Sequence, residues 1–285
     1  MAVEIVAELG QNHNGSLDVC LRMIEAAKAA GVDAVKLQKR HLPDAIPESQ
    51  RTILKSTPWG LMSYLEYRER LEFTVSQYDV IDQACKTIGI KWFVSVWDIP
   101  SLETMVARYP DMPYIKIPSA CLTDDLLLAE AAGCGIPVVL STGMSTAAEV
   151  DHAMHLFDWG AEGNDFTVCH CNSTYPCPVG DLNLRCLAWL NKTYPWARLG
   201  YSGHEVGLAT TIAAVALGAQ YVERHFTLDR SMWGSDQAAS VEPGGFKRLV
   251  KDIRNVEQAL GDGLKRVTPG ELEAMRRLRR IPSPA

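Results

Sequence analysis

Eight short runs of strand-forming residues alternate with amphipathic helical patterns along this chain of 285 residues, and this alternation limits the possible folds more than any other feature. Strand-like segments separated by helix-length segments are typical of βα units, which build parallel sheets. The expected strands are Val3–Leu9, Ala34–Gln38, Lys91–Ser95, Tyr114–Ile117, Val138–Ser141, Phe166–Cys169, Leu199–Ser202 and Tyr221–Arg224. The expected helices include Leu17–Ala30, Gln77–Thr87, Leu126–Ala132, Ala147–Phe157, Leu208–Leu217 and Phe246–Leu260.

Glycines mark the ends of these helices. Gly31, Gly89 and Gly218 each come shortly before an expected strand, where a helix C-cap is needed. Eight βα units over about 260 residues match the usual size of a (β/α)₈ barrel. The competing architecture is a doubly wound sheet, but no G-x-G-x-x-G sequence follows the first strand. The sequence therefore predicts a single α/β domain with the TIM-barrel fold.

Two segments lie outside the alternation. Residues 39–70 form a long polar excursion, which we expect to be a loop with a short helix over the top of the barrel. We place the barrel at residues 1–262 and a helical tail at residues 263–285. In the tail, Thr268 and Glu271 form a capping-box pattern, which predicts a helix over 272–280. The arginines at its end indicate either a solvated helix terminus or a binding surface.

Composition excludes several classes of protein. The chain is 47% hydrophobic and 22% charged, which excludes disorder. Its 28 Lys and Arg against 34 Asp and Glu give a net charge of −6, which argues against nucleic acid as the main partner. No apolar run approaches the roughly 18 residues of a membrane span, and the first residues do not resemble a signal peptide. We therefore expect a cytoplasmic enzyme without a membrane partner.

The eight cysteines do not indicate zinc or disulfides. Cys169, His170, Cys171 and Cys177 lie close together, but a structural zinc site usually needs a second Cys/His pair, and the sequence has none. Disulfides are rare in a reducing compartment.

Polar residues gather at the ends of the expected strands, where TIM-barrel enzymes place their chemistry. Lys36 and Lys116 stand inside apolar strands, although lysine is rarely buried unless it is paired. We expect them to bind an anion, with phosphate favoured, and Ser119, Ser141 and Ser202 to add neutral donors. The alternatives are ion pairs with Glu8 or Glu223 and a Schiff-base lysine.

His204 and His225 are expected at the tops of adjacent strands, which stand about 4.8 Å apart. Two imidazoles at that spacing can share one metal ion and leave coordination positions open for water and substrate. The alternative is that each histidine is a hydrogen-bonded structural residue.

The same segments resemble the N-acetylneuraminate (sialic acid) synthase family. The resemblance runs in family order from residue 4 to about residue 260 and is highly specific when the motifs are taken together. The matching stretches are Ala7–Gly15 (AELGQNHNG), Asp33–Gln38 (DAVKLQ), Leu140–Met144 (LSTGM), His170–Pro176 (HCNSTYP), Gly200–His204 (GYSGH) and Glu223–Asp229 (ERHFTLD).

This resemblance implies an enzyme that condenses phosphoenolpyruvate with the open-chain aldehyde of a sugar such as N-acetylmannosamine. The products would be a 2-keto-3-deoxy nonulosonic acid and phosphate. Carried over by position, His204 and His225 would hold a divalent metal, Mn²⁺ or Mg²⁺, and Glu8, Lys36 and Lys116 would be catalytic. The expected substrate-binding residues are Gln38, Ser95, Asp98, Ser119, Ser141, Ser173, Tyr175, Ser202 and Asp236, with Tyr175 and Asp236 on the sugar side.

The implied mechanism depends on charge. The metal would polarise the aldehyde oxygen, Glu8 would be the base for the water that attacks carbon two, and the lysines would hold the phosphate and carboxylate.

Four departures from the family pattern fall mainly on the sugar side. We expect the usual C-terminal antifreeze-like domain, with its arginine, to be missing. The family's Gly-Ser-Gly-Glu reads Pro118-Ser119-Ala120-Cys121, which removes a sugar-binding glutamate, and Ser-Thr-Pro-Phe reads Ser95-Val96-Trp97-Asp98. The family's Ser-Asp-His reads Ser202-Gly203-His204. We hypothesise that Asp98 replaces the lost glutamate, and we interpret Trp97 as a packing residue rather than a stacking one.

Three other functions remain open from the sequence. The first is a metal-dependent pyruvate aldolase or lyase, which would not need both lysines. The second is a 3-deoxy-sugar-phosphate synthase, for which Lys39 and Arg40 are the basic candidates at the mouth. The third is a non-catalytic sugar-binding barrel. The resemblance also allows a homodimer.

Overall fold

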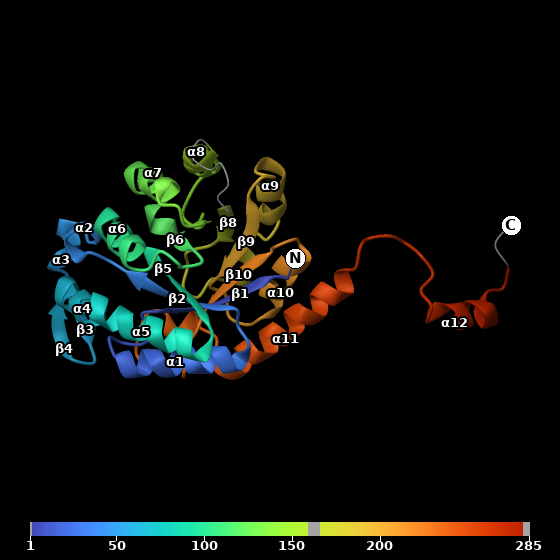
Figure 1. Cartoon of the computed structure of the whole chain (residues 1–285), viewed down its shortest axis with the longest axis horizontal. Helices are drawn as coiled ribbons and strands as arrows, with labels where there is room; N and C mark the ends of the chain where they lie inside the picture. The colour runs from blue at the N-terminus through green and yellow to red at the C-terminus, as the bar shows by residue number, and fades with distance from the viewer. Residues whose placement is uncertain (1, 159–165, 282–285) are drawn as a thin grey trace.

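A closed barrel of eight parallel strands forms the centre of the protein (Figure 1). The computed structural model describes residues 2–158 and 166–281. The barrel strands follow one another in the order β1-β10-β9-β8-β7-β6-β5-β2, so the first and last strands are neighbours. Their bounds are β1 Glu4–Gly10, β2 Ala34–Lys39, β5 Lys91–Val96, β6 Ile115–Ile117, β7 Val138–Ser141, β8 Phe166–Cys171, β9 Arg198–Gly203 and β10 Tyr221–His225. The predicted TIM-barrel fold is confirmed, and each expected strand agrees with an observed one to within two residues.

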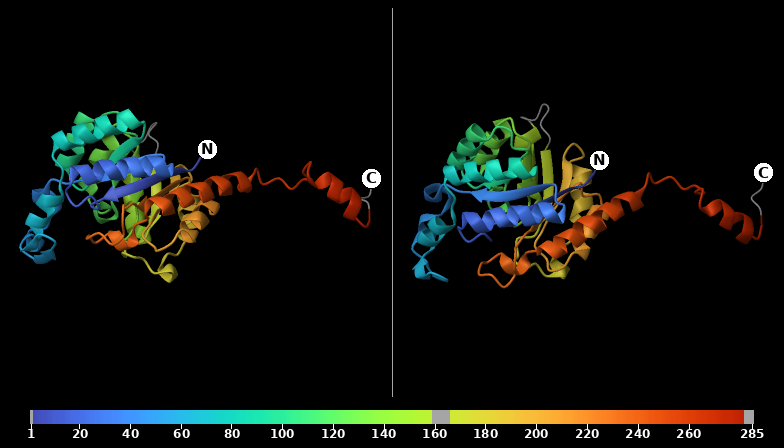
Figure 2. Two further views of the ribbon diagram at one scale, coloured as in Figure 1. Left: turned by 90° about the horizontal axis from the view of Figure 1, so that it is seen from below. Right: turned by 60° about the horizontal axis from the view of Figure 1, so that its bottom comes forward.

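Helices surround the barrel (Figure 2). They begin where the sequence supplies a cap: the Ser16 side chain accepts from the backbone of Val19 at the start of α1, and Gly31 at its end has a φ of 89°. The bounds are α1 Leu17–Ala30, α5 Val75–Ile88, α6 Ile99–Arg108, α7 Asp125–Gly133, α8 Ala147–Asp158, α9 Cys186–Thr193, α10 Ala209–Ala216 and α11 Pro243–Leu260. Short 3₁₀ turns lie at Ser119–Cys121, Val179–Asp181 and Gln237–Ala239.

The excursion after β2 is more structured than expected. It contains α2 Leu42–Ala45, α3 Glu48–Arg51, the antiparallel pair β3 Leu54–Thr57 and β4 Gly60–Ser63, and α4 Tyr64–Leu71. The expectation of a loop with one short helix was therefore wrong. The strands are only four residues long and largely exposed, so their sequence lacks the alternation that marks a half-buried strand.

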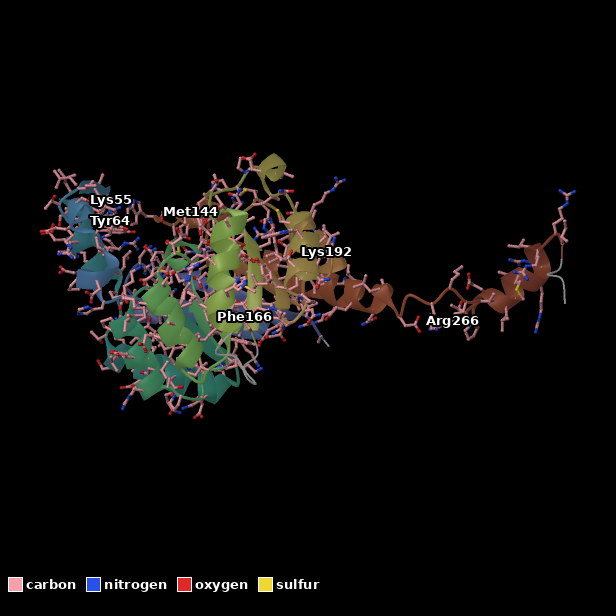
Figure 3. All side chains as sticks on the ribbon, turned by 90° about the horizontal axis from the view of Figure 1, so that it is seen from above. Lys55, Tyr64, Met144, Phe166, Lys192 and Arg266 are labelled. Carbon is pink, nitrogen blue, oxygen red and sulfur yellow. The ribbon has the colours of Figure 1, made fainter. Side chains whose placement is uncertain are left out.

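The tail extends away from the barrel. After α11, the chain runs through 261–270 to α12, which spans Glu271–Leu278 and buries no residue. Figure 3 shows Arg266 of this tail at the opposite end of the molecule from Lys55 and Tyr64 of the excursion. The predicted helix is present but ends two residues earlier than expected, and Glu271 accepts from the Thr268 backbone and hydroxyl at 2.9 and 3.0 Å. The last four residues of the predicted tail lie outside the described residues.

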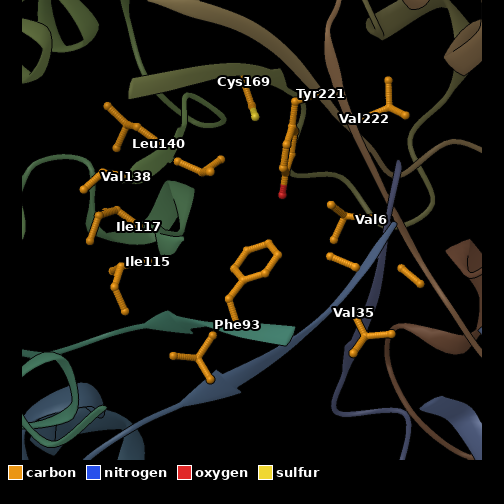
Figure 4. Close-up of a cluster of buried hydrophobic side chains, with 14 of the residues drawn as sticks. Val6, Val35, Phe93, Ile115, Ile117, Val138, Leu140, Cys169, Tyr221 and Val222 are labelled. Atoms are coloured by element: carbon orange, nitrogen blue, oxygen red, sulfur yellow. The ribbon is translucent and has the colours of Figure 1, made fainter. Parts of the chain in front are cut away.

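Successive side chains along each strand point alternately toward the surrounding helices and into the barrel interior. Ile115, Ile117, Val138 and Leu140 are buried apolar residues on the side of their strands that faces the helices, whereas Phe93, Cys169 and Tyr221 point into the space that the strands enclose (Figure 4). At the N-terminal end of the barrel, Glu4 accepts from the Tyr114 hydroxyl at 2.5 Å and from Arg198 at 2.9 Å. Large inward side chains such as these fill much of the interior of a TIM barrel, and the C-terminal ends of its strands are where ligands usually bind. No described helix is both long enough and apolar enough to cross a membrane.

Candidate active site

A pocket of about 190 Å³ opens at the C-terminal ends of the barrel strands. Twelve of the predicted site residues line it: Glu8, Lys36, Gln38, Ser95, Lys116, Ser119, Ser141, Ser173, Tyr175, Ser202, His204 and His225. The other lining residues are Trp97, Pro118, Ala120, Met144, Cys171 and Glu223. Segments from almost the whole length of the chain therefore meet at one place.

The strand register explains how these side chains meet. Glu8 of β1 lies opposite His225 on β10 and opposite Lys36 on β2. Glu223 lies opposite Ser202 of β9. Residues two apart on a strand share a face, so the inward face of β10 carries both Glu223 and His225.

Two lysines share one carboxylate at the base of the pocket. Lys36 Nζ lies 2.9 Å from Glu223 Oε1, and Lys116 Nζ lies 2.8 Å from the same oxygen. Lys36 Nζ is also 3.4 Å from Glu8 Oε2. The ion pairs that the sequence left as an alternative to anion binding are thus present. They do not balance the two lysines, because Glu223 is shared.

Burial makes the two carboxylates behave differently. Burial raises the pKa of Glu8 to about 7, with Lys36 opposing that shift and Glu223 adding to it. Burial also acts on Glu223, but Lys116 and Lys36 together hold the pKa of that carboxyl well below its usual range. Near neutral pH the cluster therefore holds two ammonium groups, one full carboxylate and one carboxylate that is partly protonated. The surplus is positive and suits an anionic ligand.

Several polar atoms around the pocket are buried without a hydrogen-bond partner. Among the described residues these include Glu8 Oε2, Ser141 Oγ, His225 Nδ1 and Trp97 Nε1. An unsatisfied buried polar atom usually costs 1–3 kcal/mol. Four of the nine such atoms in the described residues belong to residues that line this pocket, where a polar ligand could bond to them.

His204 and His225 face each other, with ring centroids 5.3 Å apart. His204 Nδ1 lies 2.7 Å from the carbonyl oxygen of Asn172 and donates to it, so in the neutral ring Nε2 carries the lone pair. Burial opposes protonation of this ring, but Cys171 raises the pKa of His204 above its ordinary value. Burial lowers the pKa of His225 to about 3, so this ring is neutral. A neutral imidazole whose second nitrogen donates to a carbonyl is a typical metal ligand.

These residues fit a divalent cation that is held by two protein nitrogens. The described residues contain no group of three or more His, Cys, Asp or Glu side chains arranged to hold a metal by themselves. The remaining coordination positions would be left for water and substrate oxygens, as a catalytic metal requires. Tyr175 packs on His204, with ring centroids 3.9 Å apart, and closes one side of this position.

The predicted role of Asp98 does not agree with its position. Its Oδ1 accepts from the backbone of Ser101 at 2.7 Å, and its Oδ2 accepts from that of His41 at 2.8 Å. Asp98 is thus the N-cap of α6 and does not line the pocket. Asp236 is also outside the lining set, although its Oδ2 lies 3.8 Å from His225 Nδ1.

Six lining residues were not in the predicted set, and three of them, Glu223, Cys171 and Trp97, make polar or ring contacts. Glu223 is the shared counter-ion of both lysines, and its alternation with His225 on one strand would have predicted its inward position. Cys171 lies on the inward face of β8, with its Sγ 3.8 Å from His204 Nδ1. Trp97 lies against Arg40, whose guanidinium carbon is 3.9 Å from the ring centroid. No sequence pattern identified that contact.

The structure gives a physical reason for Gly203, one of the departures from the family pattern. A Cβ at this position would lie 2.4 Å from Glu205 Oε2 and 2.6 Å from Tyr201 Cε1. Glu205 pairs with Arg224 at 3.0 Å, and both side chains are almost fully buried. Glycine at position 203 therefore leaves room for this buried ion pair.

Comparisons with known proteins agree with this geometry. The NeuB family model matches residues 23–265. N-acetylneuraminate-9-phosphate synthase of Drosophila melanogaster is 40% identical over 257 residues, which cover 89% of this chain and 68% of the relative. The human protein of the same name is 36% identical over 276 residues, covering 96% and 76%.

Among solved structures, an N-acetylneuraminic acid (sialic acid) synthetase from Leptospira borgpetersenii superposes with a TM-score of 0.85 at 29% identity, covering 99% of this chain and 94% of that one. With a family model that matches most of its length, the chain belongs to the NeuB family.

Proposed function

We propose that this protein condenses phosphoenolpyruvate with an open-chain aldose, giving a 2-keto-3-deoxy sugar acid of the nonulosonic type and inorganic phosphate. Membership of the NeuB family and relatives named as synthases of such acids support this proposal. The observation that carries it in this chain is the pair of buried lysines that share Glu223 at the base of the pocket. Their surplus charge suits a ligand with both a phosphate and a carboxylate.

Each group then has a role in the condensation. Lys36 and Lys116 hold the two anionic groups of phosphoenolpyruvate in a site of low dielectric, where fixed charge is worth several kcal/mol. Ser119, Ser141, Ser173 and Ser202 add neutral contacts around them. Of these, Ser141 Oγ has no partner among the described residues and is free to donate. Gln38, Ser95 and Tyr175 contact the substrates from the pocket wall, and Asp236 lies just behind His225 on the sugar side.

Glu8 is the proposed base. Its carboxyl accepts from Gln38 Nε2 at 2.7 Å through one oxygen, while the other has no hydrogen-bond partner among the described residues. A pKa near 7 suits a group that takes a proton from water and releases it again in each cycle.

His204 and His225 would hold a divalent ion, Mn²⁺ or Mg²⁺. When bound, it supplies Lewis-acid polarisation of the aldehyde oxygen. The two rings and Tyr175 orient that end of the pocket, and the neutral state of His225 keeps a lone pair available. The proposal places the reaction in the cytoplasm and allows an assembly of two copies.

The decisive experiment measures phosphate release and phosphoenolpyruvate consumption together, for a series of aldoses with Mn²⁺. One phosphate released per phosphoenolpyruvate consumed, only when an aldose is present, is the expected result. Consumption of pyruvate without phosphate release would instead identify a pyruvate aldolase. Binding of sugar without turnover under every condition would identify a non-catalytic barrel.

A further inference from the structure

Trp97 follows β5 and carries a hydrogen-bond donor that no group in the described part of the chain accepts from. The side chain lines the pocket, and its Nε1 atom is buried without a hydrogen-bond partner. An indole can donate through this atom but cannot accept. A buried donor without an acceptor costs free energy, and that cost is recovered when a ligand supplies the acceptor. The packing role expected from the sequence accounts for the ring of Trp97 but not for its N–H.

The strand that ends just before Trp97 lies between the strands that carry the two lysines. Strand β5 pairs with β2, which carries Lys36, and with β6, which carries Lys116. Ser95 of β5 lies directly opposite Lys116 and also lines the pocket. Trp97 comes two residues after Ser95, on the same side and closer to the mouth. An anion held by the lysines would therefore lie near Trp97.

Two contacts hold Trp97 in place before any ligand binds. The guanidinium carbon of Arg40 lies 3.9 Å from the centre of the indole ring and covers one of its faces. Arg40 is itself held by Gln38, whose Oε1 accepts from its Nη2 at 2.5 Å. The backbone carbonyl of Trp97 accepts from the Cys121 thiol at 3.7 Å. A donor that is fixed in this way loses little freedom when its ligand binds.

Trp97 also lies across the barrel from the proposed metal ligands. Strands β5 and β9 are four positions apart in the closed ring of eight, and His204 directly follows β9. The aldehyde is thus expected on the far side of the pocket from Trp97. Two lining serines lie nearer: Ser119 begins the 3₁₀ turn that ends at Cys121, and Ser141 Oγ has no hydrogen-bond partner in the described chain. Neutral donors beside the lysines suit the phosphate, which offers three strong acceptor oxygens.

We propose that the indole N–H of Trp97 donates to the phosphate of phosphoenolpyruvate and so orients this substrate from the mouth side of the pocket. This inference rests on the proposed function, because it assigns a further residue to the same substrate. It concerns one of the departures from the family pattern, since Trp97 stands where that pattern has a proline, which has no side-chain donor. The phosphate end is then held on the β5 side, and the enol carbon faces the aldehyde across the barrel.

The test compares ligands with and without a phosphate. Trp97→Phe keeps a ring for Arg40 to cover but removes the N–H. By calorimetry, this variant should bind phosphoenolpyruvate and inorganic phosphate at least fivefold more weakly than wild type does, whereas its affinity for pyruvate should stay within twofold. In steady-state phosphate release, its KM for phosphoenolpyruvate should rise at least fivefold and its KM for the aldose should stay within twofold.

Two controls separate the hydrogen bond from packing. Incorporation of 3-benzothienylalanine at position 97 exchanges the N–H for sulfur and keeps the shape of the ring, so it should weaken phosphoenolpyruvate binding as much as Trp97→Phe does. Trp196→Phe removes an indole N–H from a ring that is 44% exposed, packs on Phe166 and does not line the pocket. It should leave every affinity unchanged. Thermal unfolding of each variant shows whether the fold is intact.

The possible outcomes are distinct. Wild-type affinity for phosphoenolpyruvate in the benzothienylalanine variant would overturn the inference and make Trp97 a packing residue. Equal losses for phosphoenolpyruvate and pyruvate would overturn it as well, because the contact would then not be to the phosphate. A loss confined to the KM for the aldose would assign the N–H to the sugar instead.

Failure of the proposed function would be recognised separately. If no aldose triggers phosphate release, the proposed function fails, but calorimetric binding of phosphoenolpyruvate to wild type and to the variants still decides the inference. If wild type does not bind phosphoenolpyruvate at all, both are overturned.

Discussion

Lys116 and Lys36 differ in how their charges are neutralised, although both contact Glu223. Lys116 is fully buried, and its pKa is raised by Glu223 against the effect of burial. Its Nζ also lies 3.5 Å from Ser202 Oγ, at the base of the pocket. Lys36 shares its charge between Glu223 and Glu8. Lys116 is therefore the better placed of the two to act on an anionic ligand.

Replacing Lys116 by Met should reduce activity by a factor of about 100 or more, because a preorganised charge is lost from a water-excluded site. The loss should appear in the KM for phosphoenolpyruvate and in kcat, measured by steady-state phosphate release. Lys86→Met removes a lysine whose side chain is 64% exposed on α5 and serves as the control. A change confined to the KM for the aldose would contradict the assignment.

His13 links the motif after β1 to the pH dependence of stability. Its ring is buried, stacks on Phe73 with centroids 4.2 Å apart, and accepts from the Gly15 backbone at 3.0 Å. Burial lowers the pKa of His13 to about 4. Between pH 4 and 6.5 the unfolded chain therefore binds a proton that the folded protein does not, so stability falls as the pH is lowered through this range.

We expect His13 to account for up to about 3 kcal/mol of the stability lost between pH 7 and pH 4. Urea unfolding across this range should show a smaller loss in His13→Asn than in wild type, since asparagine keeps an acceptor but does not titrate there. Parallel curves for the two proteins would show that His13 is not responsible.

The sequence predicted most of the chemical groups of the pocket but not all of their positions. Glu8 and both lysines follow from strand alternation, since each is polar on a strand whose other face is largely apolar. The two histidines follow from their places at strand ends, since His204 comes directly after β9 and His225 ends β10. Asp98 could not be placed in this way, because it lies after its strand, where the backbone direction is set by the helix that it caps. The Arg40–Trp97 contact joins two separate strand ends, so no local pattern contains it.

At the level of elements, the ends of β9 and β10 are held together from outside the barrel. Arg224 faces outward between Glu223 and His225 and contacts the segment just after β9. Its guanidinium donates to Glu205 Oε1 at 3.0 Å, to the Gly207 carbonyl at 2.9 Å and also to the Glu205 carbonyl. Glu205 directly follows His204, so this network fixes the backbone next to both histidines.

Glu205→Gln should lower the free energy of unfolding by about 3 kcal/mol, because it leaves the Arg224 charge buried without its partner. Mn²⁺ affinity, measured by calorimetry, should fall about tenfold if the pair also fixes the histidines. Glu4→Gln breaks the contact with Arg198 at the other end of the same barrel and should weaken stability without changing Mn²⁺ affinity. Equal Mn²⁺ affinity in both variants would limit the pair to a structural role.

Strands and long helices could be predicted because each has a strong local signal. Helix α1 has the expected bounds, since Ser16 and Gly31 mark both of its ends. The hairpin of β3 and β4 was missed because its pattern of exposed and half-buried residues gives no clear period. Short elements on a surface excursion are held by tertiary contacts, such as the packing of Tyr67 against Trp233.

At the scale of the whole molecule, the barrel and the tail differ in packing. The three buried residues of α11, Phe246, Leu249 and Ile253, face the barrel, whereas α12 buries none. Figures 1 and 2 show α12 well separated from the barrel in every view. We propose that residues 1–262 form the folding unit.

A chain that ends at residue 262 should keep the unfolding temperature within about 2 °C of the full chain, since α12 contributes no buried apolar area. Its affinity for phosphoenolpyruvate should be unchanged. The measurements are calorimetric unfolding and titration, and sedimentation would show whether the tail affects assembly. A large fall in the unfolding temperature would show that the tail stabilises the barrel.

Strand β1 pairs with β10, the last strand of the barrel, and this pairing determines when the protein can become active during its synthesis. His225 is made more than two hundred residues after Glu8, yet they lie opposite each other across one strand pair. Nascent chains that stop short of the last strand contain both lysines but neither closure nor the second imidazole. Almost the entire barrel must therefore leave the ribosome before any turnover begins. Fragments that end before β10 have no catalytic activity.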